Sequence, residues 1–81
     1  MTPEQSRAAR GWLAWSQDDL AKRSGVTKNT IYGFESGRRV PSRNNLAAIR
    51  RAIEDGGINL LFDDQGSAVG IAIVHQSADE A

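Results

Sequence analysis

Apolar residues before residue 56 recur at the three- and four-residue spacing of amphipathic helices. Each of the segments that they form follows a side chain able to cap a helix: Thr2, Ser16, Thr27 or Ser42. Glycines follow the last three segments, at Gly25, Gly37 and the pair Gly56–Gly57, where a left-handed residue ends a helix. These signals predict helices over about residues 3–14, 17–24, 28–36 and 43–55.

The apolar positions also predict which side of two helices faces the core. Those of the fourth helix form a stripe of Leu46, Ile49, Ala52 and Ile53. On the first helix we expect Ala9, Leu13 and Trp12 to face inward. Trp12 and Trp15 are interpreted as residues of the core or of a dimer face.

After Gly57 the pattern changes to that of a β-hairpin. Segments 58–62 and 69–74 are rich in β-branched and aromatic residues, and residues 63–67 have turn composition. Alternation places Ile58, Leu60 and Phe62 on one face of the first strand, and Val69, Ile71 and Ile73 on one face of the second. A lone two-stranded hairpin is marginal in water, so we expect it to lie on the helices or to pair with a second copy.

The chain of 81 residues is interpreted as one small unit in three parts. Residues 1–56 form the helical domain, residues 57–75 the hairpin, and residues 76–81 a frayed tail. His75 is expected to be an exposed residue near the end of the second strand.

Charge is unevenly distributed although the formal net charge is zero. Residues 1–51 contain all ten basic side chains and four of the ten acidic ones, and residues 52–81 contain the other six. The first part therefore carries +6 and the second −6. This asymmetry indicates that one region of the molecule meets a polyanion.

Composition argues against several classes of protein. The chain has no Cys and a single His, so disulfides, thiol chemistry and the usual zinc clusters are not expected. Asp63 and Asp64 suggest either a divalent-cation loop or turn formers, and turn formers are the commoner case. We find no catalytic constellation, no cofactor motif, no apolar run long enough to span a membrane and no secretory signal. We therefore expect a cytoplasmic protein that is not an enzyme and has no cofactor or metal.

The second and third predicted helices are joined by the short turn Ser24-Gly25-Val26, as in a helix-turn-helix unit. The spacing around it reads Ser16-Gln17-x-x-Leu20-Ala21-x-x-x-Gly25-Val26-Thr27-x-x-Thr30-Ile31-x-x-Phe34-Glu35-x-Gly37-x-x-x-Pro41. This pattern resembles the XRE-type helix-turn-helix family of Cro and the phage repressors, over about residues 3–55. The resemblance implies a mainly α, lambda-repressor-like domain of four helices, followed here by the hairpin in place of a fifth helix.

The resemblance also implies which residues contact DNA. Gln17 matches a residue that holds a phosphate at a helix N-terminus, where free N–H groups favour an anion. Contacts to bases and phosphates are implied for Thr27, Lys28, Asn29 and Tyr32, and phosphate contacts for Arg38, Arg39 and Arg43. Arg10 and Glu35 match a salt bridge between the first and third helices.

Other interpretations of these residues stay open at this point. Gln17 is alternatively an exposed helix residue, and Lys28, Asn29 and Tyr32 are alternatively a solvated face. Arg50 and Arg51 are expected to be surface residues, with Arg50 spaced for a pair with Glu54. Gly33 departs from the family pattern because it stands where relatives often carry a side chain that reads bases. This departure puts the sequence specificity in question more than DNA binding itself.

We therefore expect a sequence-specific DNA-binding transcriptional regulator, a repressor, that inserts helix 28–36 into the major groove. A domain of this size makes few contacts, so a homodimer on half-sites about one helical turn apart is the expected form. The dimer contact is assigned to Ile58, Leu60, Phe62, Val69, Ile71 and Ile73. The alternative is a protein-interaction module, or an antitoxin, that binds a toxin-like partner through its hairpin.

Overall fold

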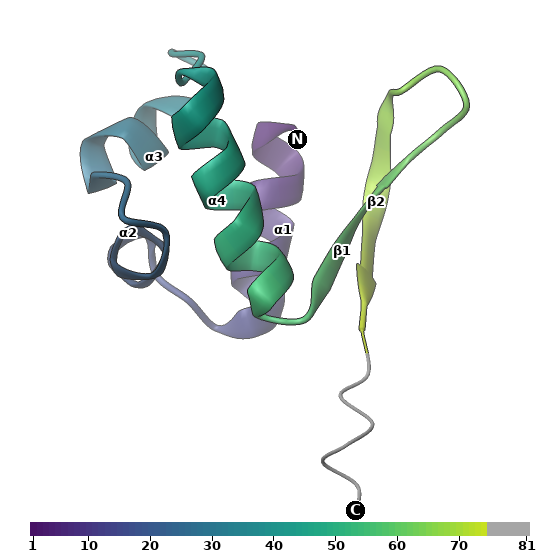
Figure 1. The fold of residues 1–81 in the computed structure, drawn as a ribbon, viewed down its shortest axis with the longest axis horizontal. Coiled ribbons are helices and arrows are strands. Elements are labelled where there is room, and N and C mark those ends of the chain that lie inside the picture. The colour runs from purple at the N-terminus through teal and green to yellow at the C-terminus, as the bar shows by residue number, and fades with distance from the viewer. Residues whose placement is uncertain (75–81) are drawn as a thin grey trace, which may run out of the picture.

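The computed structural model describes residues 1–74 and contains four helices and one antiparallel hairpin (Figure 1). The elements are α1 (Pro3–Leu13), α2 (Gln17–Ser24), α3 (Lys28–Glu35), α4 (Arg43–Asp55), β1 (Ile58–Phe62) and β2 (Ala68–Ile73). The predicted fold class is confirmed, and each helix ends within one residue of its expected position. The predicted edge residue His75 and the predicted tail lie outside the described residues.

Each helix begins at its predicted cap. Thr2 and Ser16 form capping boxes with Gln5 and Asp19, in which the cap hydroxyl accepts the backbone N–H three residues on. The reciprocal bonds run from the backbone N–H groups of the caps to the side chains of Gln5 and Asp19. These local bonds satisfy N–H groups that the first turn of a helix leaves without partners, and they explain why the starts were predictable.

The core lies between the helices and the inner face of the hairpin. Its buried apolar residues are Ala9, Leu20, Val26, Ile31, Phe34, Ile49, Ala52, Ile53, Ile58 and Leu60. Leu46, at the first turn of α4, is only partly buried. Every helix and both strands thus contribute apolar surface to one cluster, with Ile71 of β2 packed at its edge.

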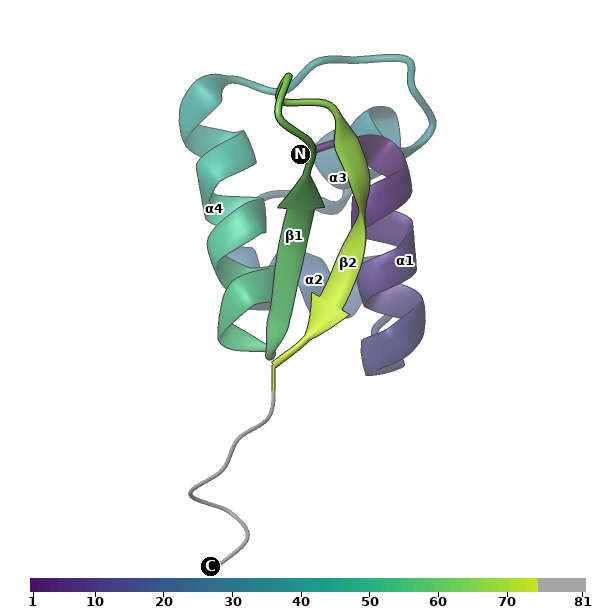
Figure 2. The same cartoon turned by 90° about the vertical axis from the view of Figure 1, so that its right-hand side faces the viewer.

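The hairpin lies on the helices, with β1 beside α4 and β2 beside α1 (Figure 2). Ile58 opposes Ile73 and Leu60 opposes Ile71, but the register shifts after Leu61 so that Phe62 opposes Ala68. The shift leaves Val69 without an opposing residue, and its side chain is 63% exposed. The predicted single apolar face over Val69, Ile71 and Ile73 is therefore wrong, because a bulge interrupts the alternation.

Burial also corrects the expected dimer surface. Ile58 is fully buried and Leu60 is 7% exposed, so both belong to the core of their own chain. The helices therefore bury part of the apolar surface that the sequence analysis assigned to the dimer contact. Phe62 and Ile73 remain exposed, and Ile71 is partly buried.

Gln5 attaches the hairpin to α1. Its side-chain nitrogen donates to the carbonyl oxygens of Leu61 and Gly70, each at 3.0 Å, while its side-chain oxygen completes the capping box with Thr2. The sequence predicted only the cap. The contact with the hairpin spans more than 50 positions along the chain, so local spacing carries no signal for it.

The two tryptophans differ from each other in environment. Trp12 is 64% exposed, so its expected inward position is wrong for the single chain. Trp15 is partly buried, and the Arg23 guanidinium lies 4.3 Å from the centre of its ring. A Cβ atom at Gly56 would come within 2.9 Å of Trp15, so the corner between α4 and β1 accommodates only glycine without movement.

Candidate nucleic-acid interface

The turn between α2 and α3 is built from local bonds. Gly25 adopts a left-handed φ of 75°, which a side chain would strain, and its N–H donates to the Ala21 carbonyl. The Ser24 hydroxyl donates to Leu20 O at 2.7 Å and accepts from Val26 N at 3.2 Å. These bonds fix the entry of the chain into α3, whose N-cap is Thr27.

The two faces of α3 have different environments. Ile31 and Phe34 are buried on the inner face, whereas Lys28, Asn29 and Tyr32 are exposed on the outer one. Lys28 Nζ lies 3.4 Å from Asp18 of α2, and both side chains remain more than half exposed. Figure 1 shows α3 and the hairpin at opposite ends of the molecule, with α1 and α4 between them. The outer face of α3 is therefore not covered by the hairpin.

Gln17, the predicted phosphate contact, points inward in this structure. Its side-chain nitrogen donates to Glu35 Oε1 at 3.1 Å, and the residue is partly buried. Gln17 is the first residue of α2, and the backbone N–H groups of a first helical turn have no acceptor within the helix. Its backbone N–H is therefore suited to bind an anion. The side-chain nitrogen has a second N–H besides the one donated to Glu35, so neither a side-chain nor a backbone contact with a phosphate requires the bond to Glu35 to be broken.

Glu35 is a buried carboxylate that joins three helices. Arg10 pairs with it at 2.7 Å, which places the predicted partners together, and Ser6 and Gln17 also donate to it. Burial alone raises the pKa of Glu35, but the hydrogen bonds from Arg10, Ser6 and Gln17 outweigh it and leave the pKa below its ordinary value. Arg7 donates to the Glu35 carbonyl oxygen. The charged carboxylate therefore holds α1, α2 and α3 in register beneath the exposed face.

The loop after α3 folds back over Gly33. Gly33 O accepts the backbone N–H groups of Arg38 at 3.0 Å and Arg39 at 3.1 Å, and the Ser36 hydroxyl at 3.2 Å. A Cβ atom at Gly33 would lie 3.3 Å from Arg39 Cβ. Gly33 is buried, and the side chain of Arg39 lies over the position that the glycine leaves without a side chain.

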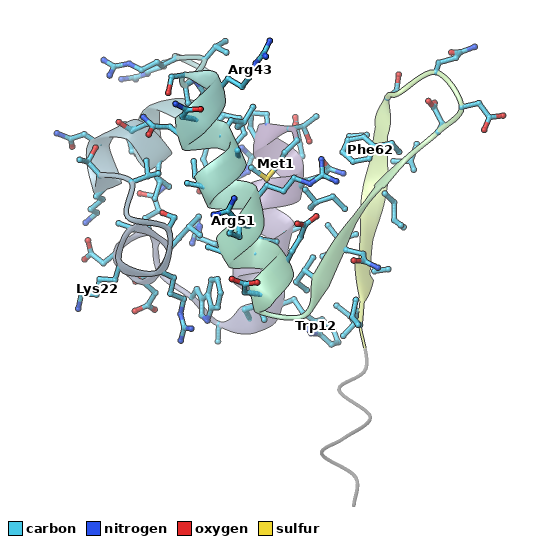
Figure 3. The ribbon with its side chains drawn as sticks, viewed as in Figure 1. Met1, Trp12, Lys22, Arg43, Arg51 and Phe62 are labelled. Carbon is cyan, nitrogen blue, oxygen red and sulfur yellow. The ribbon has the colours of Figure 1, made fainter. Side chains whose placement is uncertain are left out.

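Asn29, Tyr32, Gly33, Arg38 and Arg39 line an open cavity of about 360 Å³. The Arg38 guanidinium carbon lies 5.9 Å from the centre of the Tyr32 ring. Arg43 is exposed at the start of α4, beside this loop (Figure 3). Arg38 and Arg39 thus lie at one edge of α3, whereas Arg43 lines a separate pocket with Met1 and Arg50.

The acidic turn of the hairpin has a structural explanation. Asp63 Oδ1 accepts the backbone N–H groups of Gln65 and Ser67, both at 2.9 Å. This is the hydrogen bonding of a turn former, one of the two interpretations of Asp63. Within residues 1–74, no group of three or more potential ligands is placed to hold a metal ion. In the same range, no helix combines the length and apolarity needed to cross a membrane.

Comparison with known proteins agrees with this geometry. A family model described as Helix-turn-helix matches residues 7–54, which include α2, the turn and α3. Multiprotein-bridging factor 1 of Schizosaccharomyces pombe (strain 972 / ATCC 24843) is 31% identical over 67 residues. The match covers 83% of this chain but only 41% of that protein.

The fold and the exposed second helix of the motif define a DNA-binding domain of the helix-turn-helix class. The chain belongs to the XRE-type helix-turn-helix family, whose members regulate transcription.

Proposed function

We propose that this chain is a sequence-specific transcriptional regulator that binds DNA by inserting α3 into the major groove. The observation that carries the proposal is the exposed face of α3 with the arginine-bearing loop at its edge. An α-helix fits the major groove, where its side chains reach base edges, while flanking cations neutralise phosphates.

The exposed residues suit distinct roles at such an interface. Lys28 fits guanine O6 and N7, and Asn29 fits adenine N6 and N7. Tyr32 lies one turn further along the helix, where it reaches a thymine methyl group or a phosphate. We assign phosphate contacts to Thr27, Arg38 and Arg43, and to Gln17 through its backbone N–H.

The working form that we propose is a homodimer on a two-fold-related site, since one module of this size makes too few contacts for tight specific binding. The dimer contact uses four of the apolar side chains that the single chain leaves exposed on or near the hairpin: Trp12, Phe62, Val69 and Ile73. This end of the molecule lies away from α3, so a contact there leaves the outer face of α3 uncovered. A dimer bound in this way excludes other proteins from the same DNA, which is the reason for proposing repression.

Sedimentation of Val69→Lys tests the dimer contact. The control is Val40→Lys, because Val40 is 89% exposed in the loop before α4, away from the hairpin. We expect the wild type and the control to sediment as dimers, and Val69→Lys as a monomer at the same concentration. Removal of the whole hairpin is less informative, since it takes Ile58 and Leu60 out of the core.

DNA binding is tested by equilibrating the chain with a pool of random duplexes, sequencing the retained fragments and repeating the measurement over a salt series. We expect one enriched two-fold site, and a steep loss of affinity with salt. The double variant Lys28→Ala, Asn29→Ala should lose the preference while keeping weak binding. Absence of any enriched site from the wild-type selection would contradict the proposal.

A protein-interaction module is the alternative function. It is favoured by the exposed apolar residues of the hairpin and by the relative whose name describes multiprotein bridging. A toxin-like protein is one such partner. A chain that is monomeric and enriches no DNA site would support this alternative, whereas the basic first part of the chain favours DNA.

A further inference from the structure

Arg39 occupies the position on the recognition surface that α3 itself leaves without a side chain. Gly33 follows Asn29 by one helical turn, so the two residues share a face of α3. A Cβ atom at Gly33 would lie 3.7 Å from both Cδ and Nε of Arg39. The aliphatic part of the Arg39 side chain therefore packs over Gly33. The Arg39 guanidinium lies near the space that a long side chain at position 33 would occupy.

The backbone explains why Arg39 is held there. The N–H groups of Arg38 and Arg39 both donate to the carbonyl oxygen of Gly33, which fixes the first residues of the loop to the last turn of α3. Gly37 has a left-handed φ of 78°, which lets the chain reverse direction between them. The position of Arg39 is thus set by three main-chain features and not by the flexible side chain alone.

The charge around Arg39 suits an acceptor-rich ligand. Arg39 is exposed, and among residues 1–74 neither Arg38 nor Arg39 forms a salt bridge with a carboxylate. Both arginines line the same cavity as Asn29, the residue suited to adenine, and Arg38 lies toward the Tyr32 ring while Arg39 lies over Gly33. A planar guanidinium beside such a residue matches the O6 and N7 atoms of guanine.

We propose that Arg39 reads a guanine in the major groove from above Gly33, and that Gly33 is the positioning residue that gives it access. This inference rests on the proposed function, because it requires α3 to lie in the major groove. A phosphate oxygen offers the same acceptor chemistry as guanine, so the experiment has to distinguish a base contact from a backbone contact.

The first arm of the test replaces Arg39 by Met, which has no hydrogen-bond donor, with Arg38→Met as the matched control. Both variants lose one positive charge, so a difference in base preference between them does not come from net charge. Arg39→Met should lose roughly 5- to 150-fold of the preference for G·C at one position of each half-site. Arg38→Met should lower affinity equally for all sequences.

The second arm uses 7-deazaguanine at that position of the selected site, which removes the N7 acceptor and leaves the phosphates intact. The substitution should weaken the wild type but not Arg39→Met. Gly33→Ala should relax the same base preference, because its Cβ displaces Arg39. Gly11→Ala, another helical glycine with open space around it, should leave the preference unchanged.

The experiment distinguishes a failure of the inference about Arg39 from a failure of the proposed function. If the wild type selects a site and Arg39→Met keeps the same G·C preference, Arg39 does not read the base and the inference is overturned while the proposed function stands. If the wild type selects no site, both are overturned.

Discussion

The buried carboxylate of Glu35 shows how one residue organises the interface. Its side chain is 2% exposed, and it accepts hydrogen bonds from Arg10, Ser6 and Gln17, on helices α1 and α2. A buried charge without partners is costly, but this carboxylate is paired and hydrogen-bonded. The arrangement couples the packing of α1 to the position of the helix-turn-helix unit.

Glu35→Gln is expected to lower the free energy of unfolding by about 3 kcal/mol at neutral pH, since it leaves Arg10 without its charged partner. The folded pKa of Glu35 lies below its ordinary value, so its stabilisation is present above the unfolded pKa of about 4.3 and is lost as the pH falls. The difference between wild type and variant should therefore shrink below about pH 4. Urea unfolding across pH measures this.

Glu54→Gln is the control, because its pair with Arg50 is exposed and contributes little. A difference between wild type and Glu35→Gln that stays constant as the pH falls would contradict the assignment.

Within the helical elements and their caps, Gly11 and Gly56 differ in the space available for a side chain. Gly11 lies in α1 with nothing within 4 Å of an added Cβ, whereas a Cβ at Gly56 would meet Trp15 at 2.9 Å. Gly11→Ala should raise the free energy of unfolding by about 0.5–1 kcal/mol through helix propensity. Gly56→Ala should lower it by about 1–3 kcal/mol through overpacking. Chemical denaturation of the two variants measures both changes. Equal changes in the free energy of unfolding would contradict the structure.

The attachment of the hairpin to α1 gives a second prediction for the elements. Gln5→Ala removes the cap bond and both bonds to the hairpin, whereas Thr2→Ala removes only the hydroxyl of the cap. We expect Thr2→Ala to cost about 1 kcal/mol and Gln5→Ala about 1–3 kcal/mol more. Amide hydrogen exchange in β1 and β2 should accelerate in Gln5→Ala alone. Equal exchange in the two variants would show that the hairpin is held by apolar packing only.

The separation of charge in the whole molecule predicts its salt dependence. The basic residues 1–51 include α3 and the loop that follows it, which lie at the end of the molecule opposite the hairpin. Arg38→Gln should make the slope of log affinity against log salt shallower by about 0.9 for each chain that contacts DNA. Arg51→Gln changes the net charge equally but lies on the exposed side of α4 (Figure 3), so its slope should match the wild type. Equal slopes for the two variants would remove Arg38 from the interface.

The helices, their starts and the helix-turn-helix unit could all be predicted from the amino-acid sequence. Thr2, Ser16, Thr27 and Ser42 act within their own first turns, and the helical apolar spacing is likewise local. The pairing of Arg10 with Glu35 was also predictable, although only through the resemblance to a family.

Which side chains are exposed depends on the packing of the elements and could not be predicted from the sequence. The bulge at Val69, the burial of Ile58 and Leu60, and the exposure of Trp12 depend on how the hairpin docks on α1 and α4. The position of Arg39 over Gly33 depends on a loop that folds back on its helix. These contacts join residues whose separation in the sequence matches neither the helical nor the strand period. The local pattern of apolar and polar residues therefore does not predict them.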